Sequence, residues 1–189
     1  MFETQLRAYD RSLKLLDMDY ADLYLIHWPV TGKFTETWRA LEKIYHEGRV
    51  KAIGISNFLK VHLDILLSQA EFIPAVNQME FHPYLIQQEL VDQCVANDIL
   101  YQAWSPIMQG RVFDIPLLKQ LGKKYGKNAA QIVLRWDLQK GVATIPKSVN
   151  QARIESNSEI FDFELSAEDM SQIDALDRNQ RFGYDPMLM

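Results

Sequence analysis

The sequence contains one cysteine among its 189 residues and no long apolar segment. A single cysteine excludes an intramolecular disulfide framework and suits the reducing cytosol. No apolar run approaches the roughly 18 residues that a membrane-spanning helix needs. The first residues also lack the basic start and apolar centre of a signal peptide. We therefore expect a cytoplasmic protein with no part embedded in a membrane.

An excess of positive charge is also missing, since 20 Lys and Arg stand against 25 Asp and Glu. This balance argues against a dedicated nucleic-acid-binding protein, which needs a basic surface. The glycine motifs GxGxxG and GxxxxGK are absent, so neither a Rossmann nor a P-loop phosphate site is predicted. The 4 histidines lack HxH or HExxH spacing, and with one cysteine no metal site is predicted.

The sequence does contain a repeated unit of a short strand and a helix. Segments rich in β-branched and aromatic residues recur about every 25 to 30 residues, with one longer gap of about 40 before the last. A helical pattern follows each segment, which is typical of βα units in a parallel sheet covered by helices. No linker divides the chain, so residues 1–189 are expected to form one α/β domain. We predict strands over residues 21–27, 50–56, 74–81, 100–105 and 142–147.

Several predicted helices carry recognisable end signals. Asn128 is a good N-terminal cap and Gly141 a usual stop, which predicts a helix between them. Ser166 with Asp169 three residues later resembles a capping box at the start of another helix. Cys94 lies within a third helical pattern, where a packed thiol is expected rather than a nucleophile.

Each predicted strand is apolar at its start and gains hydrogen-bonding groups at its carboxyl end. In parallel α/β proteins, ligands bind at these carboxyl ends. We therefore predict a ligand-binding mouth formed by the polar termini of successive strands. These termini are His27-Trp28, Ser56-Asn57, Gln78 to Glu80, Trp104-Ser105 and Lys147-Ser148.

Two of these positions allow a second interpretation. His27 ends an apolar run, so it is either a core histidine bonded to a backbone carbonyl or a residue of the site. Lys147 and Arg153 flank Ser148 in the segment IPKSVNQAR. They form either a phosphate-binding group made of side chains or the ordinary solvated start of a helix.

Several longer segments resemble the aldo-keto reductase family in order and spacing, and the resemblance covers essentially the whole chain. Bacterial-type NADPH-dependent members, including diketogluconate and methylglyoxal reductases, are the most similar. The resemblance implies a (β/α)₈ barrel of TIM type, NADPH as the cofactor, and reduction of a small aldehyde or ketone to an alcohol. The segments are LDMDYADLYLIHWP, GISNF, VNQMEFHPY, AWSP, IPKSVNQARIESN and IFDFELS.

The resemblance also implies roles for residues at the ends of the first three predicted strands. His27 matches the family histidine that donates a hydrogen bond to the substrate carbonyl. Trp28 matches an aromatic wall of the substrate pocket. Ser56, Asn57 and Gln78 match the groups that hold the nicotinamide carboxamide.

Further matches imply how the rest of the cofactor is held. Trp104 occupies the position of the aromatic residue that stacks on the nicotinamide ring. Ser105, Ile107 and Gln109 fall in the loop that crosses the pyrophosphate.

The last matches lie near the carboxyl end of the fifth predicted strand. Lys147, Ser148 and Arg153 match contacts to the 2′-phosphate, which favour NADPH over NADH. Asn157 matches a contact to the adenine.

Three strands of the family barrel have no counterpart in this sequence. A complete barrel of this type needs about 250 residues, whereas five strands are predicted here. The resemblance implies that the family's catalytic Tyr, Lys and Asp come from the missing strands, which leaves His27 alone. We therefore expect an incomplete arc, the C-terminal portion of a barrel, that is inactive by itself.

Two alternatives to a complete reductase remain at this point. The chain is either a truncated, non-catalytic fragment that binds nucleotide, or an open-sheet binding module that is complete at five strands. An open arc leaves unpaired strand edges, so we also expect self-association of the chain.

Overall fold

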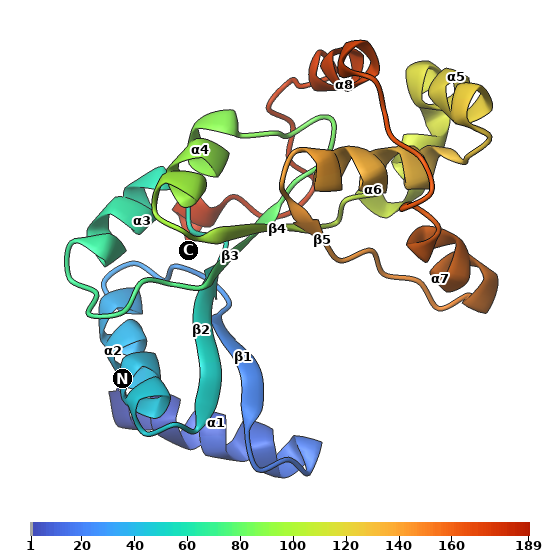
Figure 1. The fold of residues 1–189 in the computed structure, drawn as a ribbon. Coiled ribbons are helices and arrows are strands. Elements are labelled where there is room, and N and C mark those ends of the chain that lie inside the picture. Colours follow the sequence, from blue (N-terminus) through green and yellow to red (C-terminus); the bar gives the residue numbers. More distant parts are fainter. Residues whose placement is uncertain (1) are drawn as a thin grey trace. The chain divides into compact units, whose positions relative to one another are not determined.

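The computed structural model describes residues 2–189. They form two compact units: unit 1 comprises residues 2–78, 89–100 and 185–189, and unit 2 comprises residues 79–88 and 101–184. The strands are parallel neighbours in the order β1-β2-β3-β4-β5, which is their order in the sequence. Along the chain, helices come between successive strands (Figure 1). The predicted α/β class and parallel sheet are therefore confirmed. The order lacks the reversal of a doubly wound sheet, and it is the order in which barrel strands follow one another.

Unit 1 contains the first two strands, the start of the third, and most of the helices that precede β4. Strands β1 and β2 run parallel, with Ala21 opposite Val50 and Ile26 opposite Ile55. Ser56 of β2 lies opposite Gln78 of β3. The elements are α1 (Phe2–Leu16), β1 (Ala21–Ile26), α2 (Phe34–His46), β2 (Val50–Ser56), α3 (Lys60–Leu67), β3 (Val76–Glu80), α4 (Gln88–Ala96) and the 3₁₀ helix η2 (Pro186–Leu188).

The core of unit 1 lies between α2 and the first two strands. Helix α2 buries Trp38, Leu41 and Ile44, while β2 contributes Ile53 and Ile55. These apolar positions on α2 recur at three-residue steps, so one face of the helix meets the sheet. Burial of such a face is what holds a helix of this length in place.

A glycine allows β2 and β3 to approach each other. A side chain on Gly54 would place its Cβ 2.8 Å from the carbonyl oxygen of Val76. That separation is too short for a carbon beside a backbone oxygen, so any larger residue would push the strands apart. This pairing matters because it aligns the carboxyl ends of β2 and β3.

Unit 2 contains the last two strands and the helices that follow them. Strands β4 and β5 run parallel, with Gln102 opposite Ala143. The ring of Phe81 stacks on that of Trp136 from α6, with ring centres 5.1 Å apart. The elements are β4 (Leu100–Trp104), the 3₁₀ helix η1 (Met108–Asp114), α5 (Pro116–Tyr125), α6 (Ala129–Gln139), β5 (Ala143–Thr144), α7 (Gln151–Ser158) and α8 (Ala167–Asp174).

The predicted caps are borne out for α6 and in part for α8. The Asn128 side chain accepts a hydrogen bond from the Gln131 amide at 3.0 Å, and Gly141 follows the helix with a left-handed φ of 74°. The Ser166 hydroxyl likewise accepts from the Asp169 amide at 3.2 Å. The expected return bond from Asp169 is wrong, because the Ser166 amide instead donates to the Tyr125 hydroxyl at 3.0 Å.

The fifth strand is shorter than the predicted span 142–147. Its ladder covers Ala143 and Thr144, and the Ile145 amide adds one more bond to the carbonyl of Ala103 at 3.2 Å. Pro146 follows and has no N–H to donate, so the ladder cannot continue past it. The predicted residues from Lys147 onward therefore lie in a loop.

Cys94 is fully buried on α4, which confirms the expected packed thiol. Burial raises the pKa of its thiol to about 11, so the reactive thiolate form is rare at neutral pH. No helix within residues 2–189 is both long enough and apolar enough to cross a membrane.

Candidate functional site

In unit 1, polar groups meet at the carboxyl ends of the three strands, as predicted. The Ser56 hydroxyl and the Asn57 amide both donate to the carbonyl oxygen of Gln78, at 2.8 and 2.9 Å. The Asn57 side-chain amide donates to the carbonyl oxygen of His27 at 2.9 Å and to the Ser56 hydroxyl at 3.1 Å. Four of the predicted residues therefore belong to one hydrogen-bonded group.

Asn57 is the centre of this group because of its backbone conformation. Its φ of 65° lies in the left-handed region, which asparagine tolerates better than other residues that carry a side chain. Ser56 and Asn57 are each 2% exposed. The buried amide thus joins the ends of β1 and β2 and fixes the backbone at His27.

The His27 side chain projects from this fixed backbone. The residue is exposed, and its ring stacks on that of Trp28 at a centre-to-centre distance of 5.8 Å and an interplanar angle of 29°. A core histidine bonded to a carbonyl would be buried, so that interpretation does not fit. The two rings stand at the end of a strand where they can face a ligand.

Unit 2 contains a cavity of about 800 Å³ that collects most of the other predicted residues. The cavity lies between the loop that follows β4 and the segment from β5 to α7. Sequence reasoning missed several further lining residues. The predicted residues that line it are Ser105, Ile107, Gln109, Lys147, Ser148, Arg153 and Asn157, and the missed ones include Phe113, Asn128, Ile145 and Val149.

The missed residues add an apolar and an amide component to the cavity. Phe113 and Ile145 are 45% and 42% exposed. The Asn128 side chain donates to the Ser156 hydroxyl at 3.0 Å, which links the start of α6 to α7. Asn128 is the helix cap identified from the sequence, and nothing in that pattern indicated a second role.

The cationic residues of the cavity stand at the start of α7. Asn150 caps this helix by accepting from the Arg153 amide at 3.1 Å, and the Ser148 hydroxyl accepts from the Asn150 amide at 3.1 Å. No salt bridge joins Lys147 or Arg153 to a carboxylate within the described part of the chain. Two exposed cations beside a capped helix start favour an anion.

The segment from Ser105 into the start of η1 has an unusual backbone. Ser105, Met108 and Gln109 have φ values of 56°, 51° and 55°, and Gly110 follows at 95°. A left-handed residue other than glycine costs on the order of 1 kcal/mol, so local contacts must hold this conformation. The Met108 amide donates to the carbonyl oxygen of Ser105 at 2.9 Å, and the Gly110 amide donates to that of Ile107 at 2.8 Å.

Trp104, the predicted stacking residue, does not line this cavity. It ends β4, and its indole ring lies so close to Gly183 that a side chain at position 183 would overlap it. The glycine is therefore required where the chain passes the tryptophan. The stacking of Trp104 on the nicotinamide ring therefore stays a prediction.

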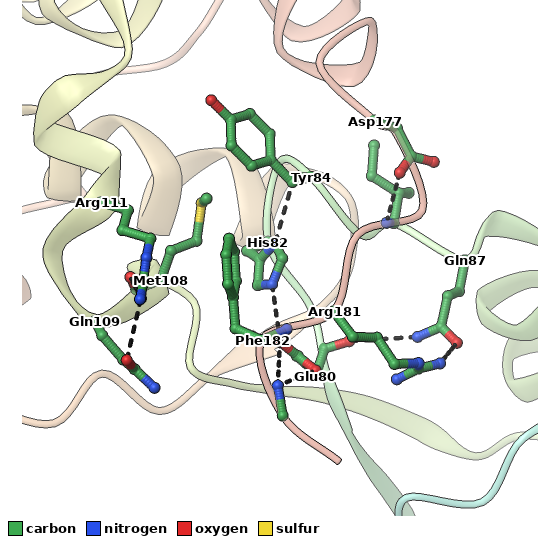
Figure 2. Close-up of polar contacts among 12 residues, drawn as sticks. Glu80, His82, Tyr84, Gln87, Met108, Gln109, Arg111, Asp177, Arg181 and Phe182 are labelled. Carbon is green, nitrogen blue, oxygen red and sulfur yellow. Dashed lines mark hydrogen bonds and ion pairs between the residues drawn. The ribbon is translucent and has the colours of Figure 1, made fainter. Parts of the chain in front are cut away.

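Glu80, another of the polar strand termini, is fully buried. Its carboxylate accepts from the amides of Phe182 and Gly183 at 2.7 and 3.2 Å and lies 3.1 Å from Nε2 of His82 (Figure 2). Burial raises the pKa of Glu80, but the hydrogen bonds from His82 and the two amides outweigh it, so its pKa is lowered. Glu80 therefore anchors the chain and does not face a ligand.

The chain combines a parallel α/β fold, polar groups at the strand ends and a cavity lined by cations, and comparison with known proteins gives its family. A model of the Aldo/keto reductase family matches residues 3–178. The glyoxal reductase of Bacillus subtilis (strain 168) is 55% identical over 185 residues, which cover 98% of this chain and 67% of that protein. The 9,11-endoperoxide prostaglandin H2 reductase of Trypanosoma cruzi (strain CL Brener) is 46% identical over 188 residues, covering 98% and 66%.

Solved structures agree with the sequence relatives. The apo crystal structure of Gox0644 superimposes with a TM-score of 0.95 at 41% identity, covering 98% of this chain and 69% of that one. MGS-M4, an aldo-keto reductase from a deep-sea metagenome, gives a TM-score of 0.94 at 39% identity, covering 97% and 69%. The chain belongs to the aldo/keto reductase family, and it spans about two thirds of the length of the curated relatives it matches.

Proposed function

We propose that the cavity of unit 2 binds the phosphate-bearing half of NADPH for the reduction of small carbonyl compounds. The observation that carries this proposal is the gathering of seven predicted cofactor residues around one cavity of about 800 Å³. Two of them are cations without a carboxylate partner in residues 2–189, which suits a phosphate. The family supports the same cofactor, since a variant of Gox0644 was solved with NADPH and a Bombyx mori member with NADP.

The positions of the side chains suggest which of them would contact each part of the nucleotide. Lys147, Ser148 and Arg153 would hold the 2′-phosphate at the start of α7. Gln109 and the left-handed loop would lie along the pyrophosphate. Asn157, with the apolar groups of the same cavity, would contact the adenine.

The polar group of unit 1 would serve the reacting end. Ser56, Asn57 and Gln78 would hold the nicotinamide carboxamide and so select the ring face that is used. The role of Trp104 as the residue that stacks on the nicotinamide stays a prediction from the family resemblance. NADPH supplies the hydride when bound. His27 would donate a hydrogen bond to the substrate carbonyl oxygen, where negative charge develops during the transfer. The hydrogen bond to its backbone and the stacking on Trp28 would restrict the orientation of the imidazole.

We also propose that the five strands correspond to an arc of the barrel found in this family, and that both units belong to that one domain. The TM-score of 0.95 over 98% of the chain supports this assignment. The bacterial-type subfamily is favoured by the 55% identity to the Bacillus subtilis glyoxal reductase. A small dicarbonyl or aldehyde is accordingly the substrate class we would test first.

The cofactor proposal is tested by measuring NADP⁺ and NAD⁺ binding to the wild type and to a double variant, Lys147→Ala with Arg153→Ala. We expect the double variant to lose at least about tenfold in affinity for NADP⁺, because each charge-assisted contact is worth roughly 1.5–3 kcal/mol. Its affinity for NAD⁺, which lacks the 2′-phosphate, should change much less. Isothermal titration calorimetry gives both dissociation constants.

A matched control removes two cations from the same unit outside the cavity. Lys119 and Lys123 are exposed on α5 and do not line the cavity. The variant Lys119→Ala with Lys123→Ala should bind NADP⁺ as the wild type does. Equal losses for NADP⁺ and NAD⁺ in the Lys147 and Arg153 variant would place the phosphate contact elsewhere. A wild type that binds neither nucleotide would refute the proposal.

The 189-residue chain itself is proposed to bind the nucleotide without reducing a carbonyl. His27 is the one member of the family's four catalytic residues that the resemblance identifies in this sequence. We expect no NADPH oxidation above background when purified chain of verified mass is mixed with glyoxal. Turnover that the variant His27→Ala abolishes would contradict this expectation. Sedimentation of the same sample tests self-association through β1, which pairs with β2 alone among the described strands.

A further inference from the structure

The segment 177–184, here called the C-terminal strap, is fastened to unit 2 at several points. The Asp177 carboxylate accepts from the Ile86 amide at 3.4 Å, and the Gln180 amide donates to the carbonyl oxygen of Tyr84 at 2.8 Å. Arg181 donates to the Gln87 side chain at 2.6 Å. Figure 2 shows the contacts of Asp177 and Arg181.

The strongest fastening is made by the buried pair of Glu80 and His82. Both side chains are fully buried. Nδ1 of His82 accepts from the Tyr84 amide at 3.3 Å, so the ring proton is on Nε2 and is donated to Glu80 at 3.1 Å. The carboxylate also accepts hydrogen bonds from the amides of Phe182 and Gly183. These bonds fix the position of the Phe182 backbone.

The fixed Phe182 ring supports a guanidinium group on another segment. The guanidinium carbon of Arg111 lies 4.6 Å from the centre of that ring, which is a cation–π distance. The His82 ring lies on Phe182 as well, with ring centres 5.3 Å apart. Arg111 therefore rests on an aromatic surface whose position the buried pair determines.

Arg111 in turn holds the left-handed turn beside the cavity. Its Nη1 donates to the carbonyl oxygen of Met108 at 3.1 Å and to the side-chain oxygen of Gln109 at 3.0 Å. Met108 and Gln109 are the two adjacent residues with positive φ. Gln109 lines the cavity, whereas Arg111 does not. Arg111 thus acts on the cavity wall from outside.

We propose that Arg111 is a positioning residue for the pyrophosphate end of the nucleotide. It joins the turn at Met108 and Gln109 to Phe182, and through Phe182 to the buried pair of Glu80 and His82. The turn has a costly backbone, and without the guanidinium the Gln109 side chain would lose its fixed orientation. This inference rests on the proposed function, because it assumes that the cavity binds NADP(H).

The variant Arg111→Met tests the proposal, since it keeps the length of the side chain and removes the guanidinium. We expect its affinity for NADP⁺ to fall by roughly tenfold, because the freed Gln109 side chain and its turn must then be ordered when the ligand binds. Its affinity for adenosine 2′-phosphate, which has no pyrophosphate, should change less than about twofold. A general loss of structure would instead weaken both ligands equally. Calorimetric titration of each variant with both ligands measures this split.

A second variant separates Arg111 from the strap. Phe182→Leu removes the ring under the guanidinium but leaves the backbone amide that binds Glu80. It should reproduce a part of the NADP⁺ loss with the same indifference to adenosine 2′-phosphate. Arg111→Lys, which keeps the cation but not its planar fork, should recover part of the affinity.

The matched control is Arg178→Met, which removes an arginine of the strap. The Arg178 guanidinium lies 3.4 Å from the centre of the Tyr84 ring and is not bonded to the turn. This variant should bind both ligands as the wild type does. A double variant of Arg111→Met with Gln109→Ala should lose no more NADP⁺ affinity than the larger single loss, since Arg111 acts through Gln109.

The outcomes distinguish this inference from the function on which it rests. If the wild type fails to bind NADP⁺, the proposed function is wrong and Arg111 has no such role. If the wild type binds and Arg111→Met binds equally well, the positioning role alone is overturned. Equal losses for NADP⁺ and adenosine 2′-phosphate in a folded Arg111→Met variant would also overturn it.

Discussion

At the scale of single residues, two buried aspartates of unit 2 behave in opposite ways. Asp137 on α6 is fully buried, and burial raises its pKa well above the usual value, with only the Thr144 hydroxyl acting against it. Asp169 on α8 is also buried, but hydrogen bonds from Lys124 and Tyr125 outweigh the burial and lower its pKa. The first carboxyl opposes folding when ionised, and the second supports it.

The variant Asp137→Asn, which cannot ionise, is therefore expected to be more stable than the wild type at pH 8 by on the order of 1 kcal/mol or more, because each unit by which burial raises the Asp137 pKa is worth about 1.4 kcal/mol there. A raised folded-state pKa gives stability that is complete below the unfolded value of about 3.9 and is lost as pH rises through the folded value. The advantage of the variant should thus shrink as pH falls towards 4. Urea unfolding at several pH values measures it.

Asp169→Asn provides the opposite case in the same unit. A lowered pKa gives stability that is present above the unfolded value and is lost as pH falls through the folded one. This variant should be less stable than the wild type at neutral pH, with a difference that disappears in acid. Parallel pH profiles for the two variants would show that neither carboxyl has the environment described.

At the scale of elements, the sequence predicts those features of the fold that depend on residues close together in the chain. The strand positions and the caps at Asn128 and Ser166 follow from patterns within a few residues, and the structure confirms them. The strand β5 is short because Pro146 has no N–H, and the prediction from β-branched residues did not take this into account. The gathering of polar groups at strand ends was predictable because parallel strands place their carboxyl ends together.

Other features depend on contacts that no local pattern contains. The bond between the Phe182 amide and Glu80 joins residues 102 positions apart, so the strand pattern alone places Glu80 among the ligand-facing termini. The left-handed turn at Met108 and Gln109 carries no asparagine or glycine at those two positions to announce it. It is stable because Arg111 and the strap hold it, and both lie outside the motif.

At the scale of the whole molecule, family membership and chain length set the context. The match to the Aldo/keto reductase family extends over residues 3–178, while the chain covers 67% of the Bacillus subtilis glyoxal reductase. Unit 2 has a cavity lined by Lys147 and Arg153, and unit 1 has the hydrogen-bonded group of His27, Ser56, Asn57 and Gln78.

The central claim is that NADP(H) occupies the cavity of unit 2, and amide chemical shifts of the labelled 189-residue chain test it most directly. Titration with NADP⁺ should produce saturable shifts at Gln109, Gly110, Ser148 and Arg153, all of which line that cavity. NAD⁺ at equal concentration should shift the same loop amides but leave Ser148 and Arg153 less affected. Shifts that do not saturate, or that gather on α2 and α3 of unit 1, would contradict the claim.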